Sequence, residues 1–394
     1  MSFKKYAMFS LKATVLPIIF ICVFTNALYS QDAGVSPENP KDSKAKPTLD
    51  VGLRIQLRHE YNKLTDPADE VNDFAIRRAR VMLEGVLSPY VEYYFQFKAE
   101  NMAVGKPGAK YAYIKLIPIK QLDIYAGVID VPFTREQSFQ SSSSLLLIDR
   151  SLATESNNIF TDIGLMINGK LFDNKLSLYL AMVNGAGGFE DGINGWKGTN
   201  SSSKDVNTYF DLAGRVEYNP LGKWKNGKEW FKRDFNLTFG AAVYYSLQRD
   251  NSSSLGNYSA SENFLGLTFD AAINWNIIYL EGGFVYQQAD PNVAYGSIGQ
   301  FESYVGYYSQ IGVNLDSKNN ALVAFRFDSY EEDPGLTKDD TIRELTLGFT
   351  WYIGANGHKI KFQTEGTYQI SKGIHSTEPD TLGFIWRNQL SLNI

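Results

Sequence analysis

From residue 49 to the end of the chain, apolar and polar residues alternate one by one in many short segments. In the segment that follows Phe74, Val81 and Leu83 fall on one face while Arg80 and Glu84 fall on the other. Side chains of a β-strand point alternately to opposite faces, so each segment predicts a strand with one apolar and one polar face. The apolar face would pack on a second sheet in a soluble sandwich, or face lipid in an outer-membrane barrel.

About sixteen segments follow this pattern, and most have the roughly 9–11 residues that a tilted strand needs to cross a bilayer. Long and short connections alternate between them, except that 220–233 is long where a short one is due. An up-and-down barrel has this alternation because its periplasmic turns are short and its extracellular loops are long. The sequence therefore predicts an all-β, antiparallel transmembrane barrel. The expected strands are 49–58, 74–88, 91–100, 111–116, 122–128, 162–168, 176–182, 210–218, 235–248, 263–274, 277–288, 301–315, 321–330, 342–354, 359–370 and 382–394.

The N-terminus has the composition of an exported protein. Residues 1–30 combine a basic start with a short apolar core, which predicts a signal peptide. Residues 31–47 are rich in Pro, Lys and small polar residues, so we expect a flexible periplasmic tail before a barrel of residues 48–394. Cys22 is the only cysteine and lies in the expected leader, so the mature chain would have no disulfide. The formal net charge of −5 argues against nucleic acid as a partner.

Basic residues recur on the polar faces of the expected strands. Rings of Arg or Lys favour anions in channels, so these side chains could form a track that attracts anions into the lumen. The alternative is that they pair with Glu84, Glu92, Glu100 and Glu217 on the same faces and only solvate the wall. The candidate pore-lining residues are Arg54, Arg58, Arg78, Arg80, Lys98, Lys115, Arg215, Arg326 and Arg387.

Three stretches between residues 50 and 190 resemble the phosphate-selective porin O and P family of Gram-negative outer membranes. They are FAIRRARVMLEGVL followed by VEYYFQF, then LDIYAGVIDVPFTREQSFQSSSSLLLIDRS, and then DIGLMINGKLFDNKLSLYLAMVNGAGG. The resemblance implies a sixteen-stranded barrel, usually trimeric, that passes phosphate-like anions past Arg and Lys of the lumen. It also implies that the third outer loop folds into the lumen and narrows it. The net negative charge leaves the choice between anions and cations open.

In this chain the third long connection is 130–160. A connection of this length with its own apolar segment, Leu145 to Ile148, is usually functional, so we expect a constriction loop. The alternative is an outer loop that only covers the mouth of the barrel. The charged residues expected at the constriction are Arg135, Glu136, Asp149 and Arg150.

We therefore expect an outer-membrane porin that lets small hydrophilic solutes diffuse passively, with lipid and lipopolysaccharide around it. A barrel that serves as an adhesin or partner-binding scaffold is the first alternative, and a barrel hydrolase is the second. A hydrolase would need a His beside a nucleophile. His59, His358 and His375 are scattered and none has metal-ligand spacing, so we expect no catalytic residue, metal or cofactor.

Overall fold

The structure is a computed structural model, and it describes most of the chain after residue 46. The expected signal peptide and nearly all of the expected tail lie outside the described residues. The described residues are 47–63, 70–100, 108–156, 159, 161–185, 210–222, 224, 234–249, 262–290, 303–316, 320–332, 340–353, 359–372 and 381–394.

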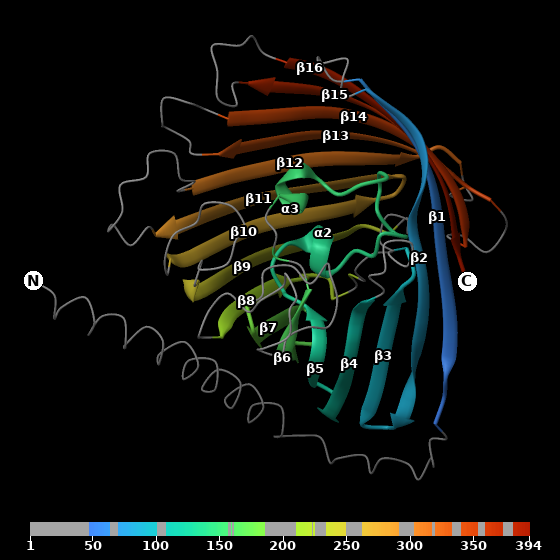
Figure 1. Ribbon diagram of the computed structural model, residues 1–394. Helices are drawn as coiled ribbons and strands as arrows, with labels where there is room; N and C mark the ends of the chain where they lie inside the picture. The colour runs from blue at the N-terminus through green and yellow to red at the C-terminus, as the bar shows by residue number, and fades with distance from the viewer. Residues whose placement is uncertain are drawn as a thin grey trace, which may run out of the picture. The chain divides into compact units, whose positions relative to one another are not determined.

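Sixteen antiparallel strands form a closed barrel within the described part of the chain, as the sequence predicts. Each strand pairs with its neighbours in sequence, and β16 closes the ring on β1 (Figure 1). The strands are β1 (Asp50–Lys63), β2 (Val71–Ser88), β3 (Val91–Lys98), β4 (Gly108–Ile119), β5 (Leu122–Asp130), β6 (Thr161–Leu171), β7 (Leu176–Val183), β8 (Asp211–Tyr218), β9 (Asn236–Arg249), β10 (Glu262–Trp275), β11 (Ile278–Asp290), β12 (Ser303–Asn314), β13 (Ala321–Glu332), β14 (Asp340–Tyr352), β15 (Ile360–Lys372) and β16 (Thr381–Asn393).

The apolar residues of the alternating segments lie on the outer face of the barrel, and the polar residues lie on its inner face. On β14, Leu345 and Leu347 are exposed on the outer face, whereas Thr346 is buried on the inner face. An exposed apolar outer surface is stable only where lipid covers it. Exposed aromatic side chains also gather near the short turns, as in the interfacial girdle of membrane barrels. They are Tyr90, Phe172, Tyr218, Phe235, Trp275 and Trp351.

Several strands extend further than the alternation indicates. The expected connection 59–72 is only 64–70, because β1 and β2 remain paired up to Asn62 and Val71. The residues added to the two strands, 59–63 and 71–73, are mostly polar, so no apolar stripe marks them although backbone pairing continues. Strand β4 likewise begins at Gly108 instead of 111, which places Lys110 within the wall.

The long connection between β5 and β6 lies inside the ring of strands (Figure 1). We call its residues 131–160 the inner loop. It contains two one-turn helices, α2 (Arg135–Ser138) and α3 (Leu152–Glu155), and most of its described residues are buried. Among the residues that the structure describes, no helix has the length and apolar character needed to cross a membrane.

Candidate solute channel

Buried arginines attach the first half of the inner loop to the barrel wall. Arg215 of β8 bonds to both carboxylate oxygens of Asp270, at 2.7 and 2.8 Å, and its Nη1 donates to the carbonyl of Phe133 in the loop. Arg135 of the loop lies 3.3 Å from Glu217 and 3.8 Å from Asp270. Burial opposes the charge on Arg135, but these two carboxylates outweigh it and raise its pKa. The result is a closed network of two arginines and two carboxylates.

Asp149 attaches the second half of the loop. Its carboxylate accepts two hydrogen bonds from Arg58, at 2.6 and 2.9 Å, and lies 3.7 Å from Arg387. Its backbone carbonyl accepts a bond of 2.8 Å from Arg326. Burial alone would raise the pKa of Asp149, but the positive charges of Arg58 and Arg387 together hold it well below its usual range. The carboxylate is therefore ionised at any physiological pH.

Apolar side chains of the loop sit over glycines of the inner wall. A Cβ added to Gly266 would come within 2.9 Å of the Phe133 ring, and one added to Gly306 would come within 2.9 Å of the Ala153 Cα. These glycines therefore allow the loop to approach the wall closely, which buries apolar surface from water. The pairs of this kind are Phe133 with Gly266, Leu146 with Gly312, Leu147 with Gly348, and Ala153 with Gly306.

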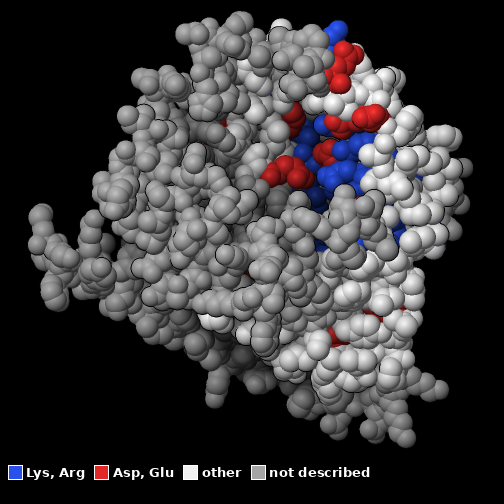
Figure 2. Space-filling model, viewed as in Figure 1, with Lys and Arg blue, Asp and Glu red and all other residues white. Residues whose placement is uncertain are grey.

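The loop thus covers one part of the wall and leaves the other part open. We call β8–β16, on which most of the loop packs, the packed arc, and β1–β7 the open arc. The loop also contacts β1 of the open arc, through Arg54 and Arg58. A cavity of about 430 Å³ lies between the loop and the open arc, with side chains from β1 to β7 in its wall. Lys and Arg side chains gather in a hollow of the molecule, with some Asp and Glu beside them (Figure 2).

Cationic side chains dominate the lining of this cavity. Arg54 donates to the hydroxyl groups of Ser142 and Ser143 in the loop, at 3.0 and 3.4 Å, and Arg80 pairs with Glu100 at 3.0 Å. The cavity is lined by seven Arg and Lys side chains against two carboxylates, so positive side chains outnumber negative ones in its wall although the chain as a whole is acidic. The cations are Arg54, Arg77, Arg78, Arg80, Lys98, Lys110 and Arg150, and the carboxylates are Asp130 and Glu155.

The predicted pore-lining residues divide into two groups. Arg54, Arg78, Arg80 and Lys98 line the cavity, as does Arg150 of the loop. The others face inward, do not line the cavity and are held in ion pairs, as Arg80 is also. Lys115 pairs with Glu92 at 2.9 Å, and the remaining members, Arg58, Arg215, Arg326 and Arg387, each have a carboxylate partner within 3.0 Å.

Two of the residues expected to line the pore and two of those expected at the constriction are fully or almost fully buried instead. Arg215 and Arg326 have fully or almost fully buried side chains, because the loop lies over them, so they hold the loop and do not line the cavity. Of the residues expected at the constriction, Arg135 and Glu136 are buried in the same way. Glu136 accepts bonds from the backbone and hydroxyl groups of Ser151 within the loop.

The sequence reasoning missed Arg77 and Lys110, both of which line the cavity. Each of the two residues is passed over in the strand pairing. Arg77 is passed over at the step from Gln56 to Leu57 of β1, and Lys110 at the step from Gln96 to Phe97 of β3. A β-bulge inserts one extra residue and re-aims its side chain. The sequence contains a sign of the first bulge, because its apolar stripe changes from even to odd numbers between Ile76 and Ala79.

The structure gives no metal site in the part of the chain that it describes. No group of three or more His, Cys, Asp or Glu residues there could hold a metal ion. His59 lies within β1 and contacts Asn72 at 2.9 Å, whereas His358 and His375 lie outside the described residues.

Solved structures with the same fold are outer-membrane proteins. The anion-selective porin from Comamonas acidovorans has a TM-score of 0.59 at 11% identity, over 89% of this chain and 100% of that chain. The outer membrane channel DcaP of Acinetobacter baumannii has a TM-score of 0.56 at 11% identity, over 88% and 98%. OprB of Pseudomonas putida has a TM-score of 0.55 at 8% identity, over 88% and 94%. At these identities the likeness shows a shared fold. No curated protein matches the chain.

The family model described as phosphate-selective porin O and P matches residues 49–369, which is most of the chain. This range begins one residue before β1 and ends within β15, so it includes nearly the whole barrel and the inner loop. Both this family and the fold are those of channels. The chain therefore belongs to the phosphate-selective porin O and P family, and it is an outer-membrane porin.

Proposed function

We propose that this porin passes small anions in preference to cations, through the space between the inner loop and the open arc. The excess of Arg and Lys over carboxylates in the cavity wall is the observation that carries the proposal. Positive side chains along a narrow aqueous path concentrate anions and repel cations. The family resemblance adds inorganic phosphate as a candidate solute.

The acidic residues of the chain do not oppose this preference, because many of them lie on the packed arc. Asp270 and Glu217 are bound to arginines under the loop, and Asp328 bonds to Arg326 at 2.6 Å. Paired charges of opposite sign largely cancel at a distance. The net charge of the whole chain is therefore a poor guide to the field in the cavity.

We propose that the inner loop narrows the lumen at the height of the cavity. In support, its described residues contact the wall on β8, β11, β12 and β15, and Arg150 projects from it into the cavity. Arg54 of the wall and Arg150 of the loop would then both line the narrow section through which a solute passes. Asp149 and Arg58 would hold one end of the narrow section in place.

Reversal potentials of the full chain in a planar bilayer, measured across a KCl gradient, test the anion preference. We expect a clear preference for chloride, and the double variant Arg54→Gln/Arg77→Gln should reduce it. Arg343→Gln is the matched control, because Arg343 is exposed on the outer face of β14 and its loss changes the net charge without changing the cavity. A cation preference of the native channel would overturn the proposal, and a channel without conductance would favour a scaffold or adhesin.

We propose a homotrimer embedded in outer-membrane lipid and lipopolysaccharide, with a cleaved signal peptide of residues 1–30. In support, OmpT of Vibrio cholerae, at a TM-score of 0.53 and 9% identity, has a trimer form, and the barrel has an apolar outer face with an aromatic girdle. Native mass spectrometry of detergent-extracted protein and its N-terminal sequence test the assembly and the cleavage.

A further inference from the structure

Four tyrosines form a continuous row along one wall of the cavity. Tyr111 and Tyr94 have ring centroids 5.7 Å apart, Tyr94 and Tyr113 are 5.6 Å apart, and Tyr113 and Tyr125 are 5.5 Å apart. We call these four residues of β3, β4 and β5 the tyrosine track. Each separation is in the range of favourable aromatic contact, and all four side chains line the cavity.

Strand register places these rings side by side. Tyr94 pairs directly with Tyr113, and Tyr111 pairs with Gln96, two residues further along β3. The hydroxyl group of Tyr111 donates to both carboxylate oxygens of Asp130, at 3.0 and 2.8 Å, which fixes the orientation of its ring. The four side chains are only half-buried, so part of each ring contacts the water of the cavity. Tyr113 and Tyr125 also pack against the buried apolar cluster that includes Val131 and Phe133. The parts of the four rings that remain accessible offer a flat apolar surface to a solute.

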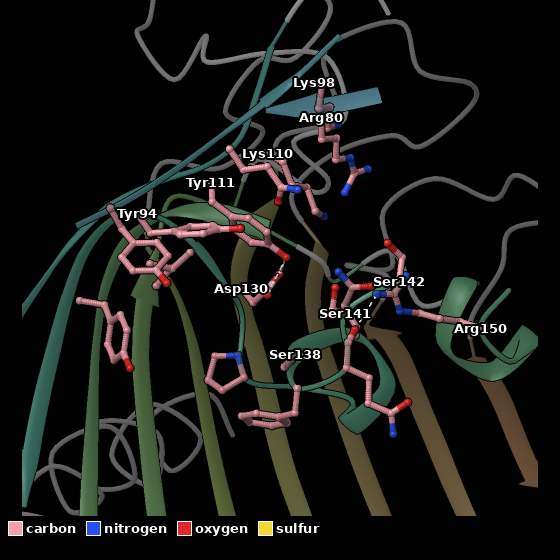
Figure 3. Close-up of a pocket in the computed structure, with 18 of the residues that line it drawn as sticks. Arg80, Tyr94, Lys98, Lys110, Tyr111, Asp130, Ser138, Ser141, Ser142 and Arg150 are labelled. Carbon is pink, nitrogen blue, oxygen red and sulfur yellow. Dashed lines mark hydrogen bonds between the residues drawn. The ribbon is translucent and has the colours of Figure 1, made fainter. Parts of the chain in front are cut away.

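The cations lie at one end of the tyrosine track. The Nζ atom of Lys110 lies 5.4 Å from the centre of the Tyr111 ring. Figure 3 shows Tyr94 and Tyr111 on one side of the cavity, with Arg80 and Lys98 above them. Arg150 and the serine hydroxyl groups of the inner loop lie on the opposite side (Figure 3).

The other end of the track is electrically balanced. Lys115 lies 5.8 Å from the Tyr125 ring, but it pairs with Glu92 at 2.9 Å and lies 3.7 Å from Asp123. A charged group of a solute is therefore attracted to the Tyr111 end, while an attached ring can lie on the tyrosines beyond it. A small inorganic anion would use only the first of these two surfaces.

We propose that the cavity binds ring-bearing organic anions, in which a carboxylate or phosphate group is attached to a flat or sugar ring, and that it binds them more tightly than anions without a ring. This inference rests on the proposed function and adds a substrate class to it. The anionic group bonds to the arginines and lysines near Arg54 and Lys110, and the ring packs on the tyrosine track.

Block of the chloride current of single channels tests the inference with the native chain. The probes are benzoate, glucose 6-phosphate, acetate and inorganic phosphate, added to the same side. Aromatic stacking of this kind changes affinity by roughly two- to tenfold, so benzoate should block at that much lower a concentration than acetate. If only benzoate blocks more strongly than its ringless counterpart acetate, the solutes are aromatic acids. If only glucose 6-phosphate blocks more strongly than inorganic phosphate, the solutes are phosphorylated sugars. Both results support the inference.

Removing two rings of the track separates stacking from charge. In Tyr94→Leu/Tyr113→Leu, the preference for benzoate over acetate should become clearly smaller than in the native channel, because two of the four rings are lost, while block by acetate changes little. The matched control is Tyr368→Leu, since Tyr368 is exposed on the outer face of β15. A benzoate preference as large in the double variant as in the native channel overturns the assignment to the track.

The outcomes separate this inference from the function on which it rests. Equal block by ring-bearing and ringless anions in the native channel overturns the inference and leaves an anion-selective porin. A native channel that prefers potassium to chloride overturns the proposed function. The native comparison requires no variant, so the inference can fail even if the double variant does not fold.

Discussion

The open arc and the packed arc of this barrel use the same residue types for different purposes. On the packed arc, Arg215 is fully buried and bonds to Asp270, Glu217 and the carbonyl of Phe133. On the open arc, Arg54 bonds to serine hydroxyl groups and lines a water-filled cavity. Both arginines lie on the inward face of their strands. What separates them is the inner loop, which covers one and leaves the other accessible.

This difference teaches that an inward charge in a barrel is not automatically a pore charge. A buried arginine with two carboxylate partners contributes to the attachment of the loop, and its field is largely cancelled outside the cluster. An arginine bonded to neutral hydroxyl groups retains its field. The selectivity of the channel is therefore expected to depend on the open arc, and its mechanical integrity on the packed arc.

The strongest test of the comparison is Arg215→Met. This change leaves Asp270 and Glu217 buried without the closer of their two arginines, and breaking a buried ion pair costs about 3–5 kcal/mol. We expect a large loss of stability in urea unfolding in detergent, followed by tryptophan fluorescence. Arg343→Met, on the outer face, should unfold at nearly the native urea concentration. Equal stability of both variants would contradict a structural role for Arg215.

A smaller effect is expected from Gly306→Ala. The added methyl group would meet the hydroxyl group of Tyr304 in the wall first, and would come within 2.9 Å of the Cα of Ala153 in the loop. Both must shift, at a cost of about 1–3 kcal/mol. The same unfolding experiment measures this cost. Gly214→Ala is the matched control, because a Cβ at Gly214 meets its nearest neighbour, Val243, at an ordinary 3.7 Å. If the control were destabilised as strongly, close approach of the loop would not explain the glycine.

The pH dependence of the loop contact at Asp149 sharpens the comparison further. Its pKa is lowered in the folded protein, so its stabilisation is fully present above the unfolded pKa, about 3.9, and is lost only as the pH falls through the lower folded pKa. We expect Asp149→Asn to raise the open-channel current noise at neutral pH, because the loop end is released from Arg58. In the native channel, titration of Asp149 should add no noise between pH 7 and pH 4. Noise that the native channel gains between pH 7 and pH 4, and that Asp149→Asn does not gain, would show that Asp149 titrates in this range and would contradict the expectation.

The smallest effect on stability is expected on the open arc itself. Arg54→Gln removes hydrogen bonds to Ser142 and Asn393 but leaves no buried carboxylate behind, so the cost is about 1 kcal/mol or less. The same variant should lower the chloride preference measured by reversal potential. A large loss of stability with unchanged selectivity would remove the distinction between the two arcs.

Much of the fold could be predicted from the local pattern. Alternation along segments such as 342–354 predicts an inside and an outside, and the long and short connections predict an up-and-down barrel. The inward orientation of Arg54, Arg78 and Arg80 follows from the same period-two rule. The rule missed Arg77 because a bulge changes the phase of β2. It missed Lys110 because β4 extends beyond the alternating segment and a second bulge turns this residue inward.

Apart from the residues at β-bulges, the sequence by itself determined which side chains face lipid and which face the lumen, because the two faces of a regular strand alternate with period two. The tertiary structure decided which inward charges are paired and covered and which line the cavity. That division depends on contacts between residues far apart in sequence, such as Phe133 with Arg215 and Asp149 with Arg387. Such contacts follow from how the inner loop packs on the closed wall, and no local pattern records them.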